Sequence, residues 1–97
     1  MTILDEAAKL VDGDREETYG HPAIDFDKVT AAAQALGVDP AVEGGLHHAL
    51  YMILVKISRL TETPKHRDSI VDIAGYARTY EKILEFNEGA VELVESA

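Results

Sequence analysis

The segment from Ala41 to Leu60 constrains the fold most, because it is helical in spacing and apolar nearly all round. Its main stripe recurs at intervals of three and four residues and consists of Leu46, Ala49, Leu50, Ile53, Ile57 and Leu60. Tyr51, Met52, Leu54 and Val55 occupy much of the remaining circumference. A helix of this kind would expose a large apolar surface in isolation. We therefore expect it to be the central helix of the fold, or to pack its second face against a partner molecule.

The residues before this segment predict two shorter helices. Residues 3–11 have helical spacing, with Thr2 available as N-cap and Gly13 as terminator. The alanine-rich stretch from Pro22 or Ala23 to about Leu36 predicts a second helix, ended by "GVDP", with its inner side formed by Phe26, Val29, Ala33 and Leu36. Between them "DGDREETYGHP" has no sustained period and contains glycine and proline, so we expect an ordered loop.

The residues after the central segment predict an antiparallel return and a long helix. "TETPKH" is long enough only for a tight connection, and a helix follows from Arg67 to Phe86. Its expected inner side is formed by Ile70, Ile73, Ala74, Ala77, Tyr80 and Leu84. "NEG" should end it, leaving residues 88–97 as a short helix or frayed tail. The prediction is one all-α domain over residues 1–97, a long antiparallel helical hairpin flanked by two shorter helices and completed by oligomerisation.

Composition limits the classes of partner. Apolar residues make up 46% of the 97 residues, cysteine is absent, and the net charge is −9. This charge disfavours binding to duplex nucleic acid or to anionic membranes. The chain has no apolar run of bilayer-spanning length, and its start lacks the order of a secretory signal, so we expect a cytoplasmic protein.

Two aspartates suggest a metal site. Asp68 and Asp72 are four residues apart and share a helix face with Gly75 and Thr79. Carboxylates so spaced can both reach Mg²⁺, which takes its other ligands from water and phosphate. Equally, the acids can favour the start of a helix, with Asp72 forming a salt bridge to Lys56 or Arg59 of the preceding helix. Spacing alone leaves both interpretations open.

Basic residues gather around the same turn. Lys56, Arg59, Lys65 and Arg67 lie within twelve positions in an otherwise acidic chain. Lys56, Arg59 and Arg67 are candidates for binding phosphate, and arginine can do so with two parallel hydrogen bonds. Long basic side chains also commonly border a core and pair with acids on the neighbouring helix. The histidines lack zinc-site spacing, and we interpret His66 as a cap or surface residue.

The loop "DREETYGHP" could cover a ligand, because it places charged, hydroxyl and aromatic groups together. Its candidate contacts are Arg15, Thr18, Tyr19 and His21. The alternative interpretation is that the ring of Tyr19 is buried and orders the loop.

These motifs together resemble a family of small helical proteins encoded mainly by actinobacterial phages and prophages. The resemblance rests on "DREETYGHP", "VKISRL" and "PKHRDSIVDIAGYA" and covers residues 3 to about 83. The chain is also similar to the helical domain associated with nucleotide modification in phages, and distantly to all-α nucleoside triphosphate pyrophosphohydrolases of the MazG and dimeric dUTPase type. In those enzymes E-x-x-E and E-x-x-D pairs hold Mg²⁺. Here Asp72 matches the final aspartate, Ser69 replaces the glutamate, and Lys56 and Arg59 stand in place of E-x-x-E.

Three functions follow as hypotheses. The first is a nucleotide-associated phage-type protein that hydrolyses a nucleoside triphosphate with Mg²⁺ if it is an enzyme. The second is a non-catalytic protein that binds or sequesters a nucleotide or cyclic nucleotide with the same cations. The third is a structural or protein-interaction module. We further expect a homo-oligomer built through the face of Tyr51, Met52 and Val55.

Overall fold

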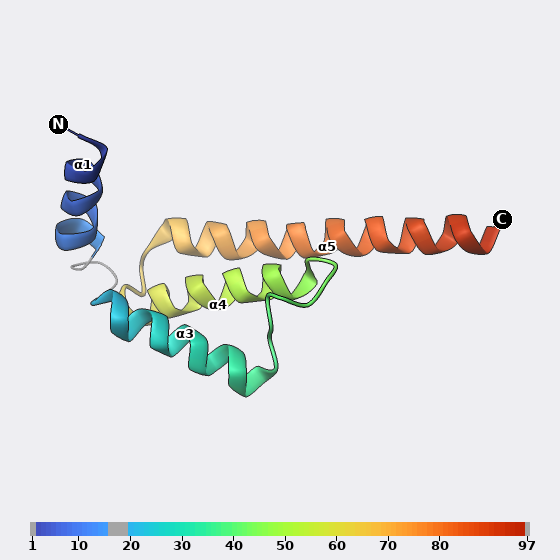
Figure 1. The fold of residues 1–97 in the computed structure, drawn as a ribbon, viewed down its shortest axis with the longest axis horizontal. Helices are drawn as coiled ribbons and strands as arrows, with labels where there is room; N and C mark the ends of the chain where they lie inside the picture. Colours follow the sequence, from blue (N-terminus) through green and yellow to red (C-terminus); the bar gives the residue numbers. More distant parts are fainter. Residues whose placement is uncertain (1, 16–19, 97) are drawn as a thin grey trace.

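The computed structural model describes residues 2–15 and 20–96, and these residues form helices and turns without a strand. The predicted all-α fold is confirmed (Figure 1). In chain order the elements are α1 (Ile3–Lys9), the π-helical η1 (Leu10–Arg15), α3 (Pro22–Leu36), α4 (Leu46–Glu62) and α5 (Arg67–Ser96). Within these ranges, no helix combines the length and the apolar composition needed to cross a bilayer.

Helix α1 begins as predicted but ends differently. Thr2 caps it in a reciprocal arrangement, in which Asp5 N–H donates to Thr2 Oγ1 at 3.1 Å and Thr2 N–H donates to Asp5 Oδ2 at 3.1 Å. The predicted stop at Gly13 is wrong, because the chain continues as η1 through Gly13 to Arg15. Gly13 is not among the glycines with positive φ, so it does not form the left-handed turn that ends a helix.

Glycines set the connection from α3 to α4. Gly37 ends α3 with φ 74°, and its N–H bonds to carbonyls of the last turn, as the "GVDP" signal predicted. Helix α4 begins at Leu46 rather than at Ala41. Gly44 and Gly45 adopt φ values of 100° and 85°, which a right-handed helix cannot include.

Helix α5 is longer than predicted. It continues through "NEG" to Ser96, so the expected break at residues 87–89 is wrong. Neither Asn87 nor Gly89 has positive φ, and the segment has no proline, so the backbone meets nothing that stops it. Figure 1 shows the C-terminal part of α5 extending beyond the end of α4.

Helices α3, α4 and α5 form one layer with α4 in the middle (Figure 1). Helix α4 packs against both neighbours, whereas α3 and α5 do not pack on each other within the described residues. Two α4 side chains show this directly, since Ser58 bonds to Asp25 of α3 and Lys56 bonds to Asp72 of α5. They are two positions apart and hence point to opposite sides of the helix. The predicted central role of this helix is confirmed.

The core of this layer is small. The buried apolar residues in the described part are Val29, Ala33 and Ala49. Several predicted inner residues are exposed instead: Phe26, Leu36, Ile70, Ala74 and Ala77. The reason is the layer itself, because each outer helix contacts only α4 and cannot bury a wide stripe. Helix α3 also diverges from α4 toward its C-terminal end (Figure 1).

Candidate functional site

The α4–α5 hairpin has two faces that differ in chemistry. Ile57 and Arg59 lie on either side of Ser58, about 100° away in opposite senses, so they point out of opposite faces of the layer. On α5, Asp68 and Ile70 flank the buried Ser69 in the same way. In antiparallel neighbours, the residues that follow the mutually facing positions share one face. Lys56 of α4 faces α5 and is followed by Ile57, and the buried Ser69 of α5 is followed by Ile70. Asp68 is thereby on the face of Arg59, and Ile70 is on the face of Ile57.

We call the first of these surfaces the polar face. It comprises Arg59 of α4 with Asp68, Asp72, Gly75 and Thr79 of α5. The sequence had placed the four α5 residues in one stripe, and the hairpin adds Arg59 beside them. The Thr79 hydroxyl donates to the Gly75 carbonyl at 3.0 Å, so its hydrogen-bond donor is already satisfied within α5.

Lys56 and Asp72 form the ion pair predicted across the hairpin. Lys56 Nζ lies 2.9 Å from Asp72 Oδ2. The lysine side chain is 11% exposed and the aspartate 44%, so the cation is the desolvated member. A nearly buried ammonium needs a partner. Lys56 is therefore committed to Asp72, and the exposed Arg67 is better placed for a ligand from solvent. Arg59 is half-buried nearby.

The same pair weakens the case for a resident metal. Asp68 is exposed, Asp72 is already neutralised by Lys56, and the described ranges contain no cluster of three or more acidic or histidine side chains suited to an ion. Two carboxylates one turn apart fit Mg²⁺ only when phosphate and water complete the shell. The donor set present does not fit Mg²⁺ as a permanently bound ion.

His66 acts at the start of α5, as predicted for a cap. Its Nδ1 accepts a hydrogen bond from the Ser69 backbone N–H at 3.3 Å. The same nitrogen is 2.8 Å from Ser69 Oγ. Ser69 is 1% exposed, so these bonds satisfy polar groups that water does not reach. This cap fixes the point from which Arg67 and Asp68 project.

The loop predicted to cover a ligand is described only at its ends. Thr18 and Tyr19 lie outside the described residues, and so does the side chain of Arg15. His21 is the N-cap of α3, where its Nδ1 accepts from Ala23 N–H at 3.1 Å. The end of the loop does reach the hairpin, since a Cβ built on Gly20 would lie 3.7 Å from Glu62 Cδ.

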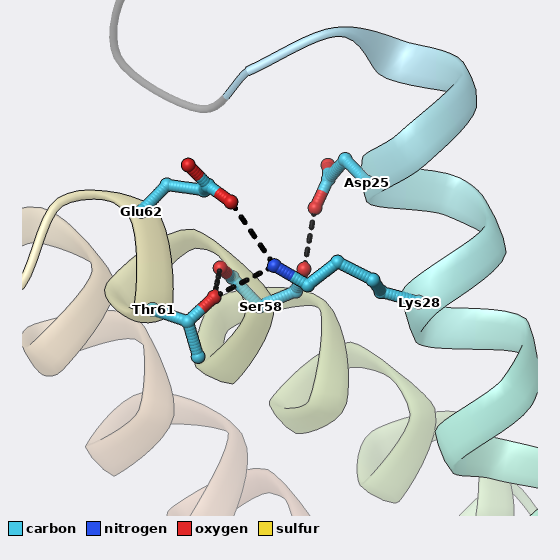
Figure 2. Close-up of polar contacts among 5 residues, drawn as sticks. All are labelled: Asp25, Lys28, Ser58, Thr61 and Glu62. Carbon is cyan, nitrogen blue, oxygen red and sulfur yellow. Dashed lines mark hydrogen bonds and ion pairs between the residues drawn. The ribbon is translucent and has the colours of Figure 1, made fainter.

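A polar cluster between α3 and α4 was not predicted (Figure 2). Ser58 Oγ donates to Asp25 Oδ1 at 2.5 Å, and both residues are buried. Lys28 Nζ donates to Thr61 Oγ1 at 3.0 Å and to Glu62 Oε1 at 3.1 Å. The cluster attaches the start of α3, and hence the end of the loop, to the last turn of α4.

The signal for this cluster in the sequence was faint. Asp25 interrupts the apolar side of an alanine-rich helix, and Ser58 interrupts an apolar helix. Buried polar residues need hydrogen-bond partners. Asp25 and Ser58 could be paired from the sequence only if the two helices were known to be adjacent. The sequence does not give that adjacency.

Fold and surface thus define a small helical-hairpin protein with one polar and one apolar face. The chain belongs to the family described as Domain of unknown function (DUF6378), whose profile matches residues 2–84. It is 40% identical over 84 residues to the Gene 55 protein of Mycobacterium phage D29, covering 87% of this chain and 54% of that protein. It is 36% identical over 85 residues to the Gene 55 protein of Mycobacterium phage L5, covering 86% of this chain and 53% of the relative.

These findings confirm the expected phage-associated helical family. They do not support the resemblance to MazG-type enzymes. The chain spans about half the length of the two Gene 55 proteins. No solved structure matches it significantly. The matched residues include α1, the hairpin and the loop, but end before the last turns of α5.

Proposed function

We propose that this chain binds a phosphorylated small molecule, a nucleotide in the simplest case, on the polar face at the α4–α5 turn. The observation that carries the proposal is the meeting of the loop and the turn at one end of the molecule, where Gly20 approaches Glu62. This brings the end of the loop, at Gly20, to the corner that also holds Arg59, Lys65 and Arg67. A cationic corner in a chain of net charge −9 suits a small anion better than an extended one.

Gly75 gives independent support. A Cβ built there would meet no atom within 4 Å, although the position is in the interior of α5. Glycine in a helix interior costs roughly 0.5–1 kcal/mol relative to alanine. The open space beside Asp68 and Asp72 is consistent with close approach of a ligand to the helix backbone.

A second candidate is Mg²⁺-dependent hydrolysis of a nucleoside triphosphate, favoured by Asp68 and Asp72 lying on the same face as Arg59. In that case the ion would arrive with the phosphates, and the two aspartates would bind it while Arg59 and Arg67 held the phosphate oxygens. Mg²⁺ would supply charge neutralisation for the phosphates. Binding without hydrolysis needs fewer assumptions, because Lys56 already neutralises Asp72.

Calorimetry of the parent protein with a panel of nucleoside mono-, di- and triphosphates and cyclic nucleotides, with and without Mg²⁺, tests the proposal. We expect Arg59→Ala to weaken binding about tenfold or more, the loss typical of a hydrogen bond to a charged group. Arg78→Ala is the matched control, because Arg78 is an exposed α5 arginine that pairs with Glu81 and Glu85 on the helix surface. It should leave affinity unchanged.

Two further variants separate binding from structure and from hydrolysis. Gly75→Ala should stabilise the protein and weaken nucleotide binding, whereas a purely structural glycine would do only the first. Asp68→Asn should weaken binding only when Mg²⁺ is present, and release of phosphate or pyrophosphate by the parent would establish turnover. A parent that binds none of the panel under either condition refutes the proposal, and leaves the hairpin as a structural clasp.

A further inference from the structure

We propose that a second copy of this chain packs on the face opposite the polar one, so that two hairpins stack as a four-helix dimer. We call this surface the apolar face, and define it by Leu50, Ile53 and Ile57 of α4 with Ile70, Ala74 and Ala77 of α5. It is independent of the proposed ligand site, which lies on the other side of the layer.

The geometry of the layer leaves this face uncovered. Ile57 lies between Lys56, which points to α5, and Ser58, which points to α3, so it projects from the layer and is 45% exposed. Leu50 and Ile53 lie seven and four residues before it and share its side of the helix. Ile70 follows the buried Ser69 and is 52% exposed, and Ala74 and Ala77 continue the stripe as exposed residues.

The overall dimensions show how much surface lacks a partner. The chain has an accessible surface of 7117 Å². A compact monomer of this mass exposes about 5,500 Å². The radius of gyration of this chain is 17.0 Å, against about 13 Å for a compact domain of this length.

The accessible surface of this chain exceeds that of a compact monomer by roughly 1,600 Å². Helix α1 and the end of α5 that extends beyond α4 account for part of this difference. A stable interface buries about 800 Å² on each partner. The surplus accessible surface is therefore large enough to include an interface of that size.

The chemistry of the face points to a copy of itself. The six residues that define it are aliphatic or alanine, and none is charged. Each protomer has a net charge of −9, so contacts through other surfaces would bring like charges together. An apolar helical face can pack against its own symmetry mate, with the stripe of each protomer filling the grooves of the other.

This assignment differs from the face of Tyr51, Met52 and Val55 that the sequence suggested. Half-burial of these three side chains does not by itself separate the two faces, since Leu50 and Ile53 are half-buried too. Tyr51 lines a hollow together with Thr30, Ala33 and Gln34 of α3, so it is partly occupied within the protomer. Val55 immediately precedes the inward-facing Lys56, which places it on the opposite side from Ile57.

Sedimentation velocity and light scattering of the full chain across a micromolar dilution series test the proposal. We expect the parent to be a dimer, and Ile70→Glu to raise its dissociation constant about thirtyfold or more, as for a central interface residue. Val71→Glu is a closely matched control, because Val71 is 51% exposed on the same helix and lies about 100° around it from Ile70, on the side turned away from α4. It should remain dimeric, as should Val55→Glu if it folds.

A labelling measurement keeps the test decisive if a glutamate variant unfolds. The chain has no cysteine, so Ala77→Cys and Val71→Cys each introduce a single thiol. At concentrations where the parent is dimeric, a maleimide should react at least tenfold more slowly with the thiol of Ala77→Cys than with the thiol of Val71→Cys. A helical parent that stays monomeric at tens of micromolar overturns the proposal. So does equal reactivity of the two thiols, or a dimer lost in Val55→Glu but kept in Ile70→Glu.

Discussion

Replacing Ser58 by alanine should destabilise the protein more than the loss of one oxygen atom suggests. Ser58 Oγ donates to Asp25 Oδ1 at 2.5 Å, and the two residues are 6% and 8% exposed. The variant would leave a buried carboxylate oxygen without this donor. Hydrogen bonds to charged groups contribute about 1.5–3 kcal/mol, and the free energy of unfolding should fall by that amount. For a chain of this length the corresponding fall in melting temperature is roughly 10 °C.

Urea unfolding followed by circular dichroism measures this change. All variants must be compared at one protomer concentration, because dimerisation would make stability concentration-dependent. Thr61→Ala is the comparison: Thr61 is exposed, and its hydroxyl accepts from Lys28 and donates to the Ser58 carbonyl at 2.6 Å. Loss of these bonds should cost less than about 1 kcal/mol, because neither leaves a buried carboxylate without its donor. A double-mutant cycle with Asp25→Ala should give a coupling energy of at least about 1 kcal/mol. If Ser58→Ala lies within about 0.5 kcal/mol of the parent, Asp25 does not depend on this bond and the reasoning fails.

Three other predictions concern the ion pair, a turn and a cap. Lys56→Met should be nearly neutral in urea unfolding, because Asp72 is 44% exposed and water can solvate it. Asp72→Ala should cost about 1–3 kcal/mol, because it leaves the nearly buried ammonium of Lys56 without a partner. Equal costs for the two variants would contradict the conclusion that Lys56 is the more buried member of the pair. Gly45→Ala should lower the melting temperature because Gly45 has φ 85°, which alanine adopts only with strain, and an unchanged value would mean that the turn relaxes. The Thr2 backbone N–H, and then its hydroxyl, hold the pKa of Asp5 below 3.8, so the cap of α1 should persist above that pH and be lost as pH falls through the lower value; an NMR titration midpoint at or above 3.8 would show that the cap is absent.

The sequence by itself determined the local structure wherever the chain supplies its own signal. The N-cap at Thr2, the end of α3 at Gly37 and the tight return after α4 depend on contacts within a few residues, and all were predicted. The pairing of Lys56 with Asp72 was also predictable, because a short turn fixes the register of the two helices on either side of it. The extension of α5 through Gly89 was not, because glycine permits both a helix and a stop.

Only the tertiary structure decided which surfaces have partners. Apolar periodicity marked Phe26, Leu36 and Ile70 as inner residues, yet all three are exposed, because α3 and α5 pack on opposite sides of α4 and not on each other. The Asp25–Ser58 bond and the approach of Gly20 to Glu62 join segments more than thirty residues apart. Periodicity gives the direction in which a side chain points from its own helix axis, but not what lies in that direction. The relative placement of the helices supplies that information, and with it the division of the hairpin into a polar and an apolar face.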